Sequence, residues 1–155
     1  LSVLDLSPLL GAMTGAEAVR ETIAMVQIAE KLGFNRFWVA EHHSIPAFGG
    51  SAPEILIAAM TQVTSRIRLG SGGVMLPNHS PLKIAEQFMV LEGLAPGRID
   101  LGVGRALGAT PFCRSSHFAR LSADLPVFLR QSHAERDLAM LGQQLAHLPA
   151  GVWQL

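Results

Sequence analysis

The sequence predicts an α/β fold in which parallel strands alternate with helices. Apolar segments typical of buried strands are each followed by a helical pattern, and strand starts recur about every 31 to 35 residues. Such a cycle implies right-handed parallel crossovers. Titratable residues and glycines gather where three of the strands end, which is the edge at which barrel enzymes carry their sites. These observations favour a (βα)8 barrel over a doubly wound open sheet.

The first strand and helix show the pattern most clearly. Thr14 and Glu17 have the spacing of a capping box, and Gly33 ends the helical period that follows. The strands are predicted at residues 1–6, 36–41, 67–76 and 98–103.

Two further helices are predicted between these strands. The second begins with Ser51 and Glu54 at capping-box spacing, and the third takes Ser80 as its N-cap with Pro81 in the first turn. The third helix stops before Pro96. Each strand is thus linked to the next by one helix.

The doubly wound alternative has little support in the loops. Its dinucleotide fingerprint needs three glycines at fixed spacing, and after the fourth strand Gly102 and Gly104 are followed by Gly108, one place late. A full barrel takes roughly 250 residues, so 155 residues supply about four βα units. We therefore expect residues 1–106 to form the N-terminal half of a barrel, and residues 107–155 to form a divergent helical tail with helices near 116–131 and 133–147.

Composition narrows the classes of partner. The chain is 49% hydrophobic with a mean hydropathy of +0.33, and 12 basic residues balance 12 acidic ones. Without a basic run, neither nucleic acid nor an anionic membrane is favoured, and a small molecule or another protein is expected. The single cysteine, the lack of an 18-residue apolar span and the absence of a cationic leader predict a cytoplasmic protein without disulfides.

The second strand carries the candidate chemistry. It ends in Glu41, His42 and His43, which are costly to bury unless they face a polar cavity or find partners. Alternation places His42 on the face shared with Trp38, and Glu41 and His43 on the opposite face. Adjacent histidines on opposite faces do not easily share an ion, so no metal site is expected.

Four runs together are specific enough to indicate a family. Residues 4–8 read LDLSP, 37–43 read FWVAEHH, 65–77 read SRIRLGSGGVMLP and 96–105 read PGRIDLGVGR. In this order and spacing they resemble the bacterial luciferase-like flavin-dependent monooxygenases, over about residues 1–106.

The resemblance implies a barrel that binds reduced FMN at the C-terminal ends of its strands and oxidises a small organic substrate with O2. It also implies that His42 is the catalytic histidine, that Arg105 contacts the flavin phosphate, and that Gly72 and Gly73 form a non-proline cis peptide under the flavin ring. An imidazole works as acid or base near neutral pH, and a guanidinium suits phosphate.

Each assignment has a structural alternative. His42 could be a satisfied loop or core histidine, Arg105 could form a surface ion pair, and the glycines, Gly70 included, could mark a bulge or tight packing. For His43 a hydrogen bond at the strand end is favoured, and for His79 solvent exposure.

Three functions remain open: a flavin-dependent monooxygenase or a truncated form of one, a reductase of the same superfamily that uses F420, and a non-catalytic remnant or interaction module. A flavin reductase is a possible partner. An inner face with Trp38, Leu69 and Leu101 among its candidates would be only partly covered by the tail, which predicts a homo-oligomer with weak or absent turnover.

Overall fold

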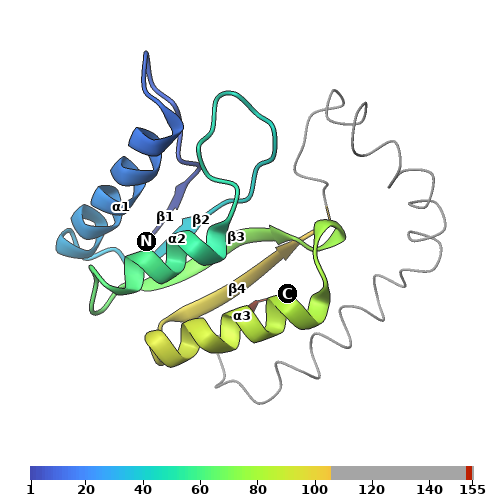
Figure 1. Cartoon of the computed structure of the whole chain (residues 1–155). Helices are drawn as coiled ribbons and strands as arrows, with labels where there is room; N and C mark the ends of the chain where they lie inside the picture. Colours follow the sequence, from blue (N-terminus) through green and yellow to red (C-terminus); the bar gives the residue numbers. More distant parts are fainter. Residues whose placement is uncertain (106–152, 155) are drawn as a thin grey trace, which may run out of the picture.

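The computed structural model of the chain describes residues 1–105 and 153–154. They form one sheet of five parallel strands in sequence order (Figure 1). The predicted alternation of parallel strands and helices is confirmed. The strands are β1 (Ser2–Asp5), β2 (Arg36–Val39), β3 (Arg68–Met75), β4 (Ile99–Gly104) and β5 (Trp153–Gln154).

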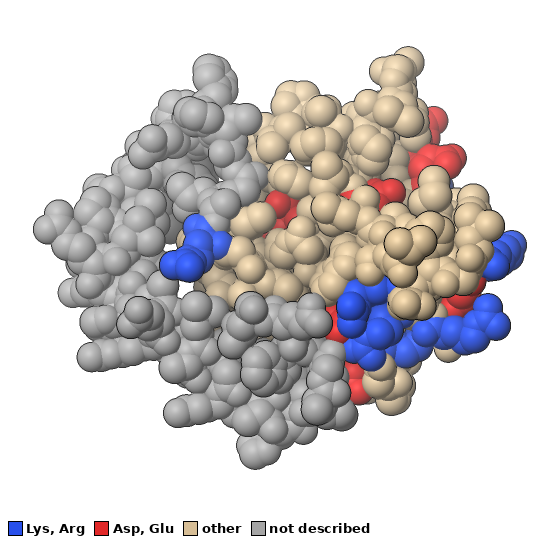
Figure 2. All heavy atoms as spheres, turned by 180° about the vertical axis from the view of Figure 1, so that it is seen from behind, with Lys and Arg blue, Asp and Glu red and all other residues tan. Residues whose placement is uncertain are grey.

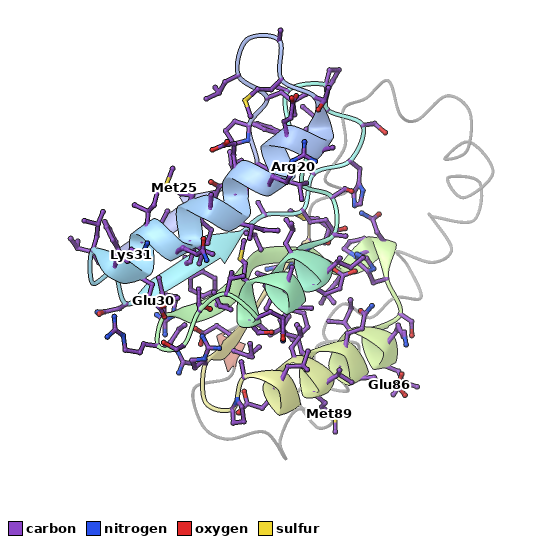
Figure 3. The ribbon with its side chains drawn as sticks, turned by 60° about the vertical axis from the view of Figure 1, so that its left-hand side comes forward. Arg20, Met25, Glu30, Lys31, Glu86 and Met89 are labelled. Atoms are coloured by element: carbon purple, nitrogen blue, oxygen red, sulfur yellow. The ribbon has the colours of Figure 1, made fainter. Side chains whose placement is uncertain are left out.

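Three helices connect the first four strands. Helix α2 packs against β3, and the short helix η1 joins β3 to α3. Met25 of α1 and Met89 of α3 point away from the sheet (Figure 3). No helix in the described residues is long and apolar enough to cross a membrane. The helices are α1 (Gly15–Lys31), α2 (Pro53–Thr61), η1 (Leu76–Asn78) and α3 (Pro81–Leu94).

The helix starts follow the predictions at two of three places. Thr14 caps α1 in a complete capping box with Glu17, and the hydrogen bonds from the Thr14 backbone and hydroxyl hold the pKa of Glu17 below its usual value. Ser80 occupies the N-cap of α3 and Pro81 its first turn. The capping box at Ser51 is wrong: α2 begins at Pro53, so Ala52 is the N-cap and no side chain caps the helix.

The core lies between the sheet and the helices. Leu69 and Leu101 are 0% and 2% exposed within it, among side chains of α2 and α3. The expectation that these two leucines line the inner face is therefore wrong. Alternation explains the error, because Trp38 packs over Gly70 on the inner face and the neighbouring Leu69 must point to the helices.

The tail differs from the expectation at its last described residues. Trp153 and Gln154 form a short parallel strand that pairs with Leu101 and Gly102 of β4, where only helices were predicted. A strand edge carries unpaired N–H and C=O groups, and pairing satisfies them. The helices predicted near 116–131 and 133–147 lie outside the described residues.

An ion-pair network crosses the N-terminal ends of the central strands. Asp100 is fully buried and accepts hydrogen bonds from Arg36 Nε at 2.7 Å and from Arg68 Nη2 at 2.6 Å. The hydrogen bond to Asp100 raises the pKa of Arg68 against the opposing effect of burial. Two guanidinium groups thus compensate a carboxylate that would be costly to bury alone.

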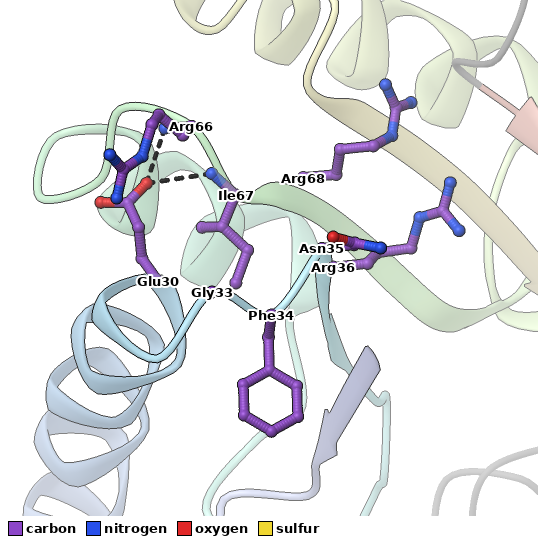
Figure 4. A pocket seen from close by; sticks show the side chains of 8 residues that line it. All are labelled: Glu30, Gly33, Phe34, Asn35, Arg36, Arg66, Ile67 and Arg68. Carbon is purple, nitrogen blue, oxygen red and sulfur yellow. Dashed lines mark hydrogen bonds between the residues drawn. The ribbon is translucent and has the colours of Figure 1, made fainter. Parts of the chain in front are cut away.

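Glu30 ties the end of α1 to the loop before β3. Its Oε1 atom accepts backbone N–H groups of Ser65, Arg66 and Ile67 at 2.9, 2.6 and 2.9 Å. Figure 4 shows Glu30 beside this loop, on the border of a pocket of about 570 Å³. Burial raises the pKa of Glu30, but the three backbone donors outweigh it, so that the pKa is lowered overall.

We predict that Glu30→Gln lowers the free energy of unfolding by about 1 kcal/mol at neutral pH, a modest figure because the site is open to solvent. A carboxyl pKa that is lower in the folded state gives stability above the unfolded pKa, and this is lost as the pH falls through the folded value. The gap between wild type and variant in urea unfolding should therefore close on acidification. Glu21→Gln, at an exposed position of α1, is the control; a pH-independent gap would contradict the role of charge.

Candidate active site

The C-terminal ends of β2, β3 and β4 form one edge of the sheet, and the predicted site residues lie along it. The register places Val39 beside Ser71 and Met75 beside Gly104. His42 follows β2 and Arg105 follows β4, while Gly72 and Gly73 lie within β3. Because the three strands are parallel neighbours, the four residues share one edge and not opposite ends of the sheet.

His42 has a polar atom that lacks a partner. Its Nδ1 atom is buried and makes no hydrogen bond among the described residues, while its backbone N–H donates to Gly50 O at 3.2 Å. The ring lies against Phe48 with centroids 4.7 Å apart. A buried nitrogen without a partner is costly in a folded protein, so this atom is a natural contact point for a ligand.

The Gly72–Gly73 peptide bond is cis, as expected from the family pattern. Gly72 is exposed, and a Cβ there would come within 3.3 Å of Leu4 and of Trp38 Cβ. Because Gly72 has no side chain, its backbone is exposed beside Trp38. Such a surface fits a planar ring system lying on the backbone.

The other two glycines of β3 have a packing role. A Cβ on Gly70 would lie 2.5 Å from the ring of Trp38, and one on Gly73 would lie 2.9 Å from Gly102 O. Close approach of an aromatic ring and of a neighbouring strand explains these residues without a ligand. The packing interpretation thus holds for Gly70 and Gly73, and of the three only Gly72 opens a surface.

Arg105 is exposed directly after β4. Figure 2 shows the molecule from behind the view of Figure 1. On this face most atoms in the middle are uncharged. A cluster of basic atoms lies on the right, and a separate basic group lies on the left. The guanidinium of Arg105 lies at the C-terminal ends of the strands, whereas Arg36 and Arg68 bind Asp100 at the N-terminal ends. It can therefore reach an anionic group of a ligand.

Sequence reasoning named Glu41 as costly to bury but did not predict its partners. Glu41 is 0% exposed, and its Oε1 atom lies 2.5 Å from His43 Nε2 and 2.8 Å from His79 Nε2, while Oε2 accepts the Met75 N–H at 2.8 Å. The predicted strand-end hydrogen bond of His43 is confirmed. Solvent exposure of His79 is wrong, because its side chain is only 26% exposed and contacts Glu41. The cost of burying Glu41 indicated that it needs partners, but not that His79 is one of them.

A second polar cluster follows β1 at the same edge. Ser7 is buried with a positive φ of 50°, and its N–H donates to Asp5 Oδ1 at 2.6 Å. The Thr22 hydroxyl lies 2.9 Å from both Asp5 Oδ1 and Ser7 Oγ. The contacts fix the turn after β1 against α1. Within residues 1–105 and 153–154, no group of three or more acidic, histidine or cysteine side chains is arranged to hold a metal ion.

Comparison with known proteins shows which family the sequence belongs to. The model of the luciferase-like monooxygenase family matches residues 2–123. This chain belongs to the luciferase-like monooxygenase family. The predicted family and its barrel-type fold are thereby confirmed, with the matched segment lying in the N-terminal part of the relatives' fold.

Curated bacterial relatives share much of the sequence. An N-acetyl-S-alkylcysteine monooxygenase of Bacillus subtilis is 52% identical over 108 residues, 70% of this chain and 32% of the relative. A luciferase-like monooxygenase of Escherichia coli is 44% identical over 129 residues, 83% of this chain and 38% of the relative. The uncharacterised YwcH of B. subtilis is 55% identical over 72% of this chain and 33% of its own length. The chain therefore spans about a third of the length of these relatives.

Solved structures show the same fold. The apo form of MsnO8 matches with a TM-score of 0.70 and 46% identity over 74% of this chain and 35% of that one. The oxygenating component of 3,6-diketocamphane monooxygenase from Pseudomonas putida, solved with FMN, matches with a TM-score of 0.65 and 24% identity over 73% of this chain and 30% of that one. At that identity the second likeness concerns the fold alone.

We predict that Gly70→Ala destabilises the protein by about 1–3 kcal/mol, the usual cost of overpacking, because the added Cβ would meet the Trp38 ring at 2.5 Å. Gly93→Ala in α3 is the matched control, since nothing lies within 4 Å of its added Cβ and alanine favours a helix. Thermal unfolding of both variants measures the difference. Equal stabilities would show that Trp38 does not constrain β3.

Proposed function

We propose that this segment carries part of the site of an FMN-dependent monooxygenase that oxidises a small organic substrate with O2 and reduced flavin. The observation that supports it best is the buried His42 Nδ1, which has no hydrogen-bond partner among the described residues and lies on the same edge as the exposed Gly72. Membership of the family supports it too. The proposal assigns catalysis to His42 and cofactor binding to Gly72, Gly73 and Arg105.

The residues present fit the cofactor. The exposed backbone of Gly72 lies beside Trp38, where a flat ring could rest, and Arg105 supplies a charged donor suited to phosphate. His42 offers an acid or base whose Nδ1 atom has no partner among the described residues. Bound reduced flavin would supply the electrons that activate O2. Gly73 would take part through its backbone, because the space at its Cα is filled by β4.

F420 is the alternative cofactor. An F420-dependent tetrahydromethanopterin reductase from Methanopyrus kandleri shares the fold, with a TM-score of 0.52 and 20% identity over 68% of this chain and 26% of that one. A titration of the chain with reduced FMN and with reduced F420, followed by absorbance, distinguishes the two. Binding of neither would favour the third function, a non-catalytic interaction module.

We predict that Arg105→Ala weakens FMN binding by about 1.5–3 kcal/mol, the contribution of a charged hydrogen bond, whereas His42→Ala leaves binding largely intact and removes any turnover. Fluorescence titration with FMN measures the first effect and oxygen consumption the second. Arg20→Ala, at an exposed position of α1, is the control for loss of positive charge. If Arg105→Ala does not change the affinity for FMN, Arg105 does not bind the cofactor and is an ordinary surface residue.

The cellular setting is also a proposal. We propose a cytoplasmic protein, in keeping with its single cysteine, that receives reduced flavin from a flavin reductase and forms a homo-oligomer. Support for self-association comes from the inner face, where Leu4 is 57% exposed and lies beside Trp38 and Gly72. An apolar surface of this kind favours association.

We predict that Leu4→Gln shifts the chain toward the monomer, because it places a polar group on the apolar inner face. Met25→Gln is the control, since Met25 is 44% exposed on the outer side of α1. Size-exclusion chromatography with light scattering at several concentrations measures the shift. A wild-type chain that is monomeric throughout would contradict the proposed homo-oligomer.

A further inference from the structure

Three hydrogen-bond donors converge on one buried carboxylate at the edge of the sheet. Glu41 Oε1 is shared by His43 Nε2 and His79 Nε2, and Oε2 takes the backbone N–H of Met75. The carboxylate is 0% exposed, whereas the imidazoles of His43 and His79 are 32% and 26% exposed. One side chain thus connects the segment after β2 to the end of β3 and to the residue after η1.

The chemistry of the three partners determines the state of each ring. An ionised carboxylate only accepts hydrogen bonds, and a backbone N–H only donates. Both histidines can therefore bond to Oε1 only if each carries its proton on Nε2. In the neutral rings this selects the Nε2–H tautomer and leaves Nδ1 as an acceptor on the other side of the ring.

The place of this cluster in the chain connects it to His42. Glu41 and His43 flank His42, and both are held by the cluster, while the His42 N–H is bonded to Gly50. The backbone on each side of His42 is therefore anchored to β3 through Glu41. Met75, the last residue of β3, lies three residues after Gly72.

We propose that Glu41 is a positioning residue with two effects. Its carboxylate selects the Nε2–H form of His43 and His79, and by anchoring the backbone on both sides of His42 it sets the direction of the His42 ring toward the cofactor site. The part that concerns His42 rests on the proposed function, and the part that concerns His43 and His79 does not. In metal sites, a carboxylate that accepts the N–H of a histidine fixes the tautomer and direction of the ring in the same way. Here a single carboxylate contacts two rings from two different segments, one after β2 and one after η1.

Glu41→Gln tests the proposal with almost no change of shape. A glutamine has one acceptor and one donor, so it cannot receive all three groups. If its oxygen faces the histidines, its NH2 opposes the Met75 N–H; if its oxygen faces Met75, both rings must move their proton to Nδ1. Either outcome is visible by NMR of the ligand-free chain with ¹⁵N-labelled histidine and backbone.

In the wild type we expect Nε2 of His43 and His79 to resonate as protonated nitrogens and Nδ1 as unprotonated ones, together with a protected Met75 amide. In Glu41→Gln we expect either a reversal of both tautomers or a Met75 amide that exchanges at least about tenfold faster. Glu86→Gln, at a surface carboxylate that is 56% exposed, should change neither. An unprotonated Nε2 on either histidine of the wild type overturns the proposal even if Glu41→Gln does not fold, and so does a variant with unchanged signals.

Addition of oxidised FMN tests the connection to His42. We expect FMN to shift the His42 ring signals of the wild type and to shift them by less than half as much in Glu41→Gln. If the wild-type His42 does not respond to FMN, the proposed function fails, while the ligand-free spectra still decide the role of Glu41. If wild type and variant respond equally, Glu41 does not position His42, and the proposal is overturned in that part.

Discussion

Parallel backbone pairing of β2, β3 and β4 is the constraint on which the structure depends. It aligns Arg36 with Arg68 and Val39 with Ser71, so that residues at equal height on neighbouring strands meet at the same end of the sheet. Within residues 1–105 and 153–154 the helices cover one face of the sheet, and Phe37 and Leu69 point into the core between them. Everything at the candidate site follows from which residues this register brings to the C-terminal edge.

The inner face shows how closely this packing is specified. Trp38 lies over Gly70, and Gly102 approaches Ser71 so closely that a Cβ on Gly102 would be 2.2 Å from the Ser71 carbonyl oxygen. Glycine is required at both positions because no side chain fits. Beside them Gly72 remains exposed. Strand β3 therefore contains two kinds of glycine: Gly70 and Gly73, where the protein's own atoms occupy the place of a side chain, and Gly72, whose backbone is exposed.

Buried polar groups have different surroundings at the two ends of the strands. At the N-terminal end, Asp100 is fully compensated by Arg36 and Arg68, which is the pattern of a structural ion pair. At the C-terminal end, Glu41 is satisfied by three donors, but the neighbouring His42 has a buried nitrogen with no hydrogen-bond partner in the part of the chain that the structure describes. This contrast agrees with the division of barrels into a stabilising end and a functional end.

The sequence alone determined the parallel α/β class, the alternation of elements, the capping box at Thr14 and the edge that carries His42 and Arg105. These features are local, because apolar periodicity and capping residues act over a few positions. The pairing register of the strands and the packing of distant segments decided the other features. Burial of Leu69 against the helices, the packing of Trp38 on Gly70, and the pairing of Trp153 with β4 depend on contacts between distant segments. The contacts of Glu41 also depend on distant segments, because its carboxylate joins His43 to His79. Since 36 positions of the chain separate those two histidines, no local pattern could indicate that they share one oxygen atom.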